Sequence, residues 1–219
     1  MEDALAASDA AVIDCSQGVE LLENPEHHHE GDDHDDHDHG HWDPHCWMDP
    51  RRAARMVENI VQGLTAADPD NGDTYRDNGQ KAALLLSTWD GEIRDLLSEE
   101  GTPEIAGLIT FHDGFQYFAQ TYGLPLLAAI EEEAGSEASA REINEITALV
   151  KEKSIPVIFT EVNGSDATAK AIARETGCAV AQMSMCMDGP DGALSNYHDA
   201  LRGNVAAIIN GFAGEERVK

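Results

Sequence analysis

The second half of the chain alternates short apolar runs with longer stretches that carry apolar residues every three or four positions. The short runs have strand length and the longer stretches have helical periodicity. The predicted strands span 105–110, 124–130, 155–160 and 178–183. The predicted helices span 113–122, 139–153, 166–176 and 196–212, and glycines 123 and 177 are stop signals for two of them. Four strand–helix alternations favour an α/β fold with a parallel sheet and helices on its faces.

Two more helices are predicted between positions 49 and 100. Asp49 and Pro50 are a good start signal, with Asp as the cap and Pro in the first turn. The next helix begins near Asp73 or Thr74, and its apolar face follows in steps of three and four: Tyr75, Gly79, Ala82, Leu86, Trp89, Ile93 and Leu96. A helix of roughly 25 residues is roughly 38 Å long. Such a helix either joins two lobes or packs along a single domain.

The charge of the chain narrows the classes of function. Among 219 residues, 42 are acidic and 14 are Lys or Arg, which gives a formal charge of −28. This field repels nucleic acid and anionic membranes, attracts cations, and fits a protein that works in high salt. No apolar run approaches the ~20 residues of a membrane span, so we expect no direct membrane insertion. No signal peptide is visible at the N-terminus, which leaves a cytoplasmic location open.

Eight of the ten histidines lie between Glu26 and Cys46, most of them in one acidic run. Imidazole is the commonest ligand for borderline transition metals, and carboxylates add oxygen donors. A solvated charged loop is the alternative, but acidic loops rarely alternate with histidine. We therefore predict metal capture by seven loop histidines: His27, His28, His29, His34, His37, His39 and His41.

Three potential ligands follow predicted strands: His112, Glu161 and Asp188. Ligands of open α/β sheets bind beyond the carboxyl ends of the strands, so these side chains are expected at one edge of the sheet. Asp188 has a rival in Asp191, and His198 is expected on a helix surface.

The four cysteines form no C-x-x-C pair, so a zinc ribbon is unsupported. Cys15 lies in a strand-like run and is expected to be buried. Cys46 follows His45, and its side chain should point away from that of its neighbour. A disulfide between Cys178 and Cys186 cannot be settled from the sequence.

The string from Asp43 to Pro50 (DPHCWMDP) resembles the DPHxWxDP motif of ZnuA/TroA-like solute-binding proteins, the zinc- and manganese-binding components of ABC importers (cluster A-I). The segments 110–118, 159–161, 173–177 and 187–189 are also similar to this family, and the likeness covers nearly the whole chain. The resemblance implies a protein that is not an enzyme. It would capture Zn²⁺ (possibly Mn²⁺) outside the cell or at its surface and deliver it to an ABC transporter permease.

The resemblance also implies an architecture and a site. Residues 1–73 would form a partial N-terminal α/β lobe with a His-rich loop at 26–41, residues 74–101 a linking helix, and residues 102–219 a C-terminal α/β lobe. His45, His112 and Asp188 would bind the metal, and Glu161 would orient a ligand histidine. Manganese-type members usually carry Glu at the position of His112, so a nitrogen ligand there favours zinc.

The chain departs from the family pattern at its start. Family members carry an export signal, further strands and a first histidine ligand before the segment equivalent to 9–15, so we expect an N-terminally truncated form with a partial sheet and an exposed edge. A cytosolic metal buffer or a non-functional fragment is one alternative. A zinc-dependent hydrolase is another, although no H-E-x-x-H motif is present.

Overall fold

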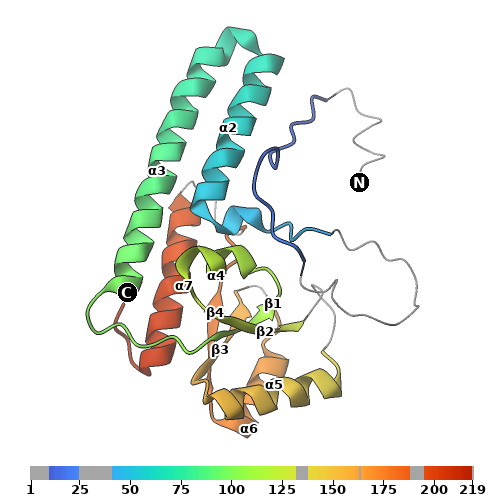
Figure 1. Cartoon of the computed structure of the whole chain (residues 1–219), viewed down its shortest axis with the longest axis vertical. Helices are drawn as coiled ribbons and strands as arrows, with labels where there is room; N and C mark the ends of the chain where they lie inside the picture. The colour runs from blue at the N-terminus through green and yellow to red at the C-terminus, as the bar shows by residue number, and fades with distance from the viewer. Residues whose placement is uncertain (1–9, 25–40, 132–137, 163, 188–194, 219) are drawn as a thin grey trace, which may run out of the picture.

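The computed structural model describes residues 10–24, 41–131, 138–162, 164–187 and 195–218. Two long antiparallel helices, α2 (Pro50–Ala67) and α3 (Gly72–Ser98), form a hairpin at one end of the molecule (Figure 1). The strands and the remaining helices gather at the other end. The short segments η2 (Cys46–Met48) and η3 (Pro69–Asn71) precede α2 and α3.

Four parallel strands build the α/β part. β1 (Leu108–His112) pairs with β2 (Leu126–Glu131), and β3 (Val157–Glu161) pairs with β4 (Ala179–Met183). β1 also lies alongside β3, so the strands are arranged in the order β2–β1–β3–β4. The predicted α/β fold with parallel pairing is confirmed.

Helices cover both faces of these strands. They are α4 (Gln116–Tyr122), α5 (Ala140–Lys153), α6 (Ala167–Thr176) and α7 (Ser195–Ala213). Alternate residues of β3 face opposite sides: Val157 and Phe159 share a core with α4 and α7, whereas Ile158 shares one with α5 and α6. This period of two produces a layer of helices on each side of the strands.

The ends of the helices follow the expected stop and start signals, with one shift. Gly123 ends α4 at a positive φ of 68°, and Ser139 caps α5 in a capping box with Glu142. The predicted start of α4 at position 113 is wrong, because β1 continues to His112 and residues 113–115 turn the chain before α4 begins at Gln116.

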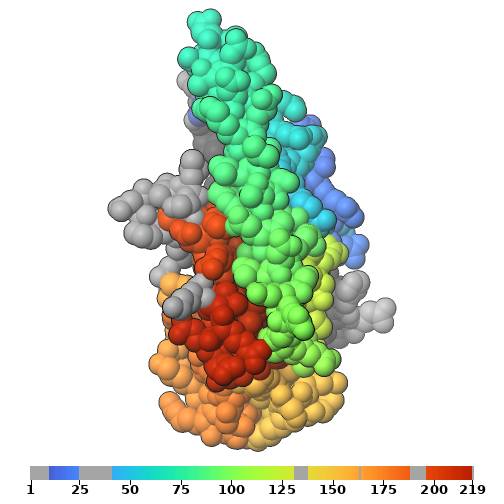
Figure 2. Space-filling model, turned by 90° about the vertical axis from the view of Figure 1, so that its left-hand side faces the viewer, coloured from blue at the N-terminus to red at the C-terminus, as the bar shows by residue number. Residues whose placement is uncertain are grey.

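The long helix α3 has 27 residues and is therefore about 40 Å long. It packs against α2 in its first part and against α7 in its last part, and Figure 2 shows it as a continuous ridge with α7 beside its lower half. Leu86 and Ile93 of the predicted apolar face are buried. α3 thus connects α2 to the α/β part, while the lobe boundaries at residues 73 and 101 stay predictions.

The N-terminal expectations need correction. Residues 10–24 contain no strand, and within the described part the only pairing there is an isolated antiparallel bridge between Glu23 and Trp42, so the predicted partial sheet is wrong for these residues. Cys15 lies in a turn and is half-buried rather than buried in a strand, and its backbone oxygen accepts from the side chain of Asn59 at 2.8 Å. All four cysteines are free thiols, including Cys178 and Cys186.

Candidate metal centre

Two histidines from distant segments meet at the carboxyl end of the central strands. His112 is the last residue of β1, and His45 directly precedes η2. Their Nε2 atoms are 3.2 Å apart although 67 positions separate the residues in sequence. β1 and β3 are adjacent strands of two two-stranded parallel sheets, and their hydrogen-bonded partners β2 and β4 lie on their outer sides. The carboxyl ends of such strands are where open α/β sheets bind ligands.

The spacing of the two nitrogens fits one tetrahedral metal ion. A Zn–N bond of about 2.0–2.1 Å places two nitrogens at neighbouring corners of a tetrahedron about 3.3–3.4 Å apart. The separation of 3.2 Å between the Nε2 atoms of His45 and His112 is close to this value. Their rings are nearly perpendicular, with an interplanar angle of 83°.

The surroundings of the two imidazoles differ. The pKa of His112 is lowered from its usual value, first by burial and then by the neighbouring His45, so His112 is uncharged at neutral pH. Nδ1 of His45 lies 2.8 Å from Oδ1 of Asp43, which leaves Nε2 as the nitrogen that faces His112. Metal binding requires neutral imidazoles, so this arrangement suits a divalent cation.

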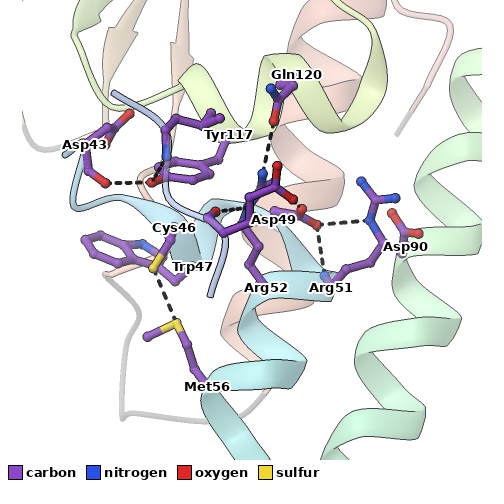
Figure 3. A network of polar contacts seen from close by, with 12 residues as sticks. Asp43, Cys46, Trp47, Asp49, Arg51, Arg52, Met56, Asp90, Tyr117 and Gln120 are labelled. Carbon is purple, nitrogen blue, oxygen red and sulfur yellow. Dashed lines mark hydrogen bonds and ion pairs between the residues drawn. The ribbon is translucent and has the colours of Figure 1, made fainter. Parts of the chain in front are cut away.

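Three hydrogen bonds fasten the segment that carries His45 to the α/β part. The Tyr117 hydroxyl of α4 donates to the backbone oxygen of Asp43 at 2.7 Å, and the two side chains are visible in Figure 3. The Trp47 indole donates to the backbone oxygen of Met185 at 2.9 Å, and the Tyr197 hydroxyl of α7 donates to the backbone oxygen of Trp47 at 2.7 Å. These bonds fix the position of His45 relative to the end of β1.

A buried ion pair also supports the segment that carries His45. Asp49 caps α2 by accepting from the backbone N–H of Arg51 at 2.9 Å, and its other oxygen lies 2.6 Å from Nη1 of Arg52. Arg52 also donates to Gln120 of α4 at 3.1 Å and lies over the Tyr117 ring (Figure 3). The start of α2 is therefore tied to α4 beside the two histidines.

A glycine allows the segment after β4 to approach His112. A Cβ atom at Gly114 would collide with the thioether of Met185 and would lie 3.0 Å from Cδ2 of His112. Met185 is buried, and its backbone oxygen is the acceptor for Trp47. Gly114 thus lets the chain after β4 pack closely against the metal centre.

The remaining predicted site residues have different environments. Glu161 ends β3 at the same edge of the strands as His112. Cys46 is buried, and its sulfur contacts that of Met56 of α2 at 3.7 Å, so its side chain points away from His45 as expected. Burial raises the pKa of the Cys46 thiol. His198 lies on the partly exposed surface of α7, with its side chain 22% exposed, where it stacks on Trp89 of α3 and lies 2.8 Å from the carboxylate of Glu92.

Several predicted ligands fall outside the described residues. Among the loop histidines only His41 is described, and it is exposed, with Nε2 3.9 Å from a carboxylate oxygen of Glu23. Six others, together with both aspartates of the 188–194 segment, lie outside: His27, His28, His29, His34, His37, His39, Asp188 and Asp191. Within the described residues, no group of three or more His, Cys, Asp or Glu side chains is close enough to hold a metal. The structure therefore brings together two of the three predicted ligands.

Sequence reasoning missed the polar residues that hold His45. Asp43, Tyr117 and Tyr197 each contact its segment directly. Asp43 carries a signal that was available, because a carboxylate two positions before a histidine can reach its ring and backbone. Tyr117 and Tyr197 carry no such local signal, because their roles depend on helices that are distant from His45 in sequence.

Two imidazoles with Nε2 atoms 3.2 Å apart at the carboxyl end of the central strands fit the metal-binding class of proteins. The chain belongs to the family described as "ZnuA: Zinc-uptake complex component A periplasmic", whose model matches residues 1–211. This family is a metal-uptake binding component and not an enzyme. The predicted family is thereby confirmed.

Curated relatives agree with this assignment. The chain is 34% identical to the zinc-binding lipoprotein AdcA of Streptococcus pneumoniae over 65% of its length, and 29% identical to the high-affinity zinc uptake system protein ZnuA of Bacillus subtilis over 94%. It is 29% identical to the iron-binding protein YfeA of Yersinia pestis over 77%. The chain spans 29%, 65% and 55% of these three proteins, respectively.

Solved structures of ZnuA-type proteins share the fold of this chain. A ZnuA crystal structure superposes with a TM-score of 0.72 at 28% identity, over 91% of this chain and 69% of that one. No helix among the described residues has both the length and the apolar character needed to cross a membrane.

Proposed function

We propose that this protein captures Zn²⁺ at the metal centre formed by His45 and His112 and delivers it to the permease of an ABC importer. The observation that carries the proposal is the 3.2 Å separation of the two Nε2 atoms, which matches neighbouring corners of a tetrahedral zinc site. Asp188 is the proposed third ligand, and Glu161, the last residue of β3, is the proposed orienting carboxylate for His112, whose buried Nδ1 has no hydrogen-bond partner among the described residues.

Zinc is preferred over manganese because the two ligands are nitrogens. Nitrogen-rich tetrahedral sites suit Zn²⁺, whereas Mn²⁺ favours oxygen ligands. The zinc-binding relatives AdcA and ZnuA support the same choice. Capture for import would take place outside the cell or at its surface, as the family's periplasmic description supports.

The His-rich loop has a separate role in this proposal. Its imidazoles and carboxylates would bind Zn²⁺ weakly and raise the concentration of the ion near the metal centre. His45 and His112 would then bind the ion more tightly, because their positions are already fixed by packing and hydrogen bonds.

A calorimetric zinc titration of a double variant, His45→Ala with His112→Ala, tests the proposal. The variant is expected to lose the tight binding site while weak binding by the loop survives. His198→Ala is the matched control, because it removes an imidazole whose partners are Trp89 and Glu92 rather than His45 or His112. Tight binding that persists in the double variant would exclude His45 and His112 as ligands.

A further inference from the structure

We propose that Asp43 is the positioning residue of the metal centre, because its carboxylate holds the His45 imidazole in the tautomer and orientation that direct Nε2 toward the metal. The inference rests on the proposed function in one respect: it takes His45 as a ligand. It goes beyond the proposed function because it assigns the tautomer and orientation of that ligand to a side chain that is not itself a proposed ligand.

The geometry around one carboxylate oxygen carries the proposal. Oδ1 of Asp43 lies 2.8 Å from the ring Nδ1 of His45 and also 2.8 Å from the backbone nitrogen of His45. The backbone nitrogen is a donor in every state, so Oδ1 accepts there. An ionised oxygen facing Nδ1 requires a proton on that nitrogen, since two lone pairs at this distance would repel each other. The proton of a neutral His45 is then at Nδ1, and Nε2 has a free lone pair.

The environment of Asp43 strengthens this interaction. The residue is 3% exposed, and among the described residues its second oxygen, Oδ2, has no hydrogen-bond partner. The nearby guanidinium of Arg52 is paired with Asp49 instead. Oδ1 accepts from the ring N–H and the backbone N–H of the same histidine, and a buried carboxylate with so few donors holds the ring firmly, because losing the ring N–H would leave it with the backbone bond alone among the described residues.

The backbone of Asp43 is fixed independently of its side chain. Its N–H donates to the backbone oxygen of Leu22 at 2.9 Å, and its carbonyl accepts from the Tyr117 hydroxyl at 2.7 Å. The Tyr117 hydroxyl in turn accepts from the backbone N–H of Leu22 at 2.9 Å. Replacing the side chain therefore removes the contact to the ring while the segment keeps these backbone anchors.

The imidazole tautomer in the metal-free protein is the first test. ¹⁵N–¹H correlation spectra of the His45 ring are expected to show protonation at Nδ1 in the unmodified chain. In Asp43→Ala a large share of the ring should shift to protonation at Nε2. In Asp43→Asn the carbonyl oxygen can still accept from both nitrogens, so Nδ1 protonation should persist. An Asp43→Ala spectrum like that of the unmodified chain, or a folded Asp43→Asn with the tautomer lost, would overturn the proposal.

Titration with Zn²⁺ alone is the second test. Loss of a carboxylate that orients a ligand histidine weakens metal binding by about 10- to 100-fold, and this is the loss expected for Asp43→Ala. Asp43→Asn should lose much less. Asp73→Ala is the matched control, because it removes one negative charge that is exposed at the start of α3, where it pairs with Arg76.

The two proposals fail in different ways. If the unmodified chain does not bind Zn²⁺ tightly, the proposed function is wrong, while the tautomer spectra still decide whether Asp43 orients His45. If the unmodified chain binds tightly and Asp43→Ala binds equally well, the proposed function stands and the role of Asp43 is refuted.

Discussion

At the scale of single residues, the burial of His112 sets the response of the metal centre to pH. Its lowered pKa means that the neutral imidazole persists below the ordinary histidine value of about 6.5. Protons therefore compete with the metal at His112 only at lower pH than at an exposed histidine. Zinc affinity is expected to fall as the pH drops below about 6.5, because protonated imidazoles cannot bind metal.

Two measurements check this pH dependence. Calorimetric zinc titrations across the pH range give the affinity, and NMR of the metal-free protein gives the titration midpoint of His112 itself. The expected midpoint lies below about 6.5. A midpoint at or above this value would mean that burial does not control the proton affinity of His112.

The sequence predicts the two histidines as site residues, but it does not predict the side chains that hold them in place. His45 was found through its motif and His112 through its place after an apolar strand, and the structure places their rings in contact. The bonds from Tyr117 and Tyr197 were not predictable, because they join helices α4 and α7 to a segment more than 70 positions away. Hydrogen bonds of this kind depend on the packing of elements and leave no local pattern.

At the scale of elements, α3 carries an apolar face that anchors the α/β part. Ile93 is 0% exposed and belongs to the core shared with α7, whereas Leu84 on the same helix is 69% exposed. Ile93→Ala is expected to lower the free energy of unfolding by about 2–5 kcal/mol, because it removes buried methyl groups and leaves a cavity. Leu84→Ala should change it by less than about 0.5 kcal/mol. Urea denaturation of both variants measures the difference, and equal losses would contradict the packing of α3.

The attachment of η2 to α7 can be tested at one hydroxyl. Tyr197 is largely buried, burial raises its pKa strongly, and its O–H donates to the backbone oxygen of Trp47. Tyr197→Phe should lower stability by about 1–3 kcal/mol, because it leaves a part-buried carbonyl without this donor. Zinc affinity should fall as well, since Trp47 lies two residues from His45. Thermal unfolding and a zinc titration measure both effects, and unchanged values for both would show that this bond is dispensable.

The regular elements were predicted well where local pattern decides the structure. The helix ends at Gly123 and Gly177 follow from backbone conformation, because glycine adopts the positive φ that ends a helix. The predicted N-terminal partial sheet was wrong among the described residues, where only the bridge between Glu23 and Trp42 forms. Pairing of strands needs a partner elsewhere in the chain, which an apolar run cannot specify.

At the scale of the whole molecule, the net charge of −28 favours cations near the surface. The His-rich loop adds imidazoles to this acidic field, and its two ends are held together. Asn24 donates to the backbone oxygen of His41 at 3.0 Å, and Glu23 bridges to Trp42. The loop therefore begins and ends at one point of the molecule, close in sequence to Asp43 and His45.

This closure makes the loop removable without disturbing the metal centre. Replacing residues 26–40 by a short Gly–Ser linker removes six histidines while Asn24, His41 and the Glu23–Trp42 bridge remain. The number of zinc ions bound per chain is expected to fall, while the tight site keeps its affinity, because His45 and His112 are held by α4, α7 and the segment after β4. Calorimetry gives both quantities in one titration. Loss of the tight site in this deletion would mean that a loop histidine completes the coordination of the metal, and separate substitutions of the six histidines would then identify it.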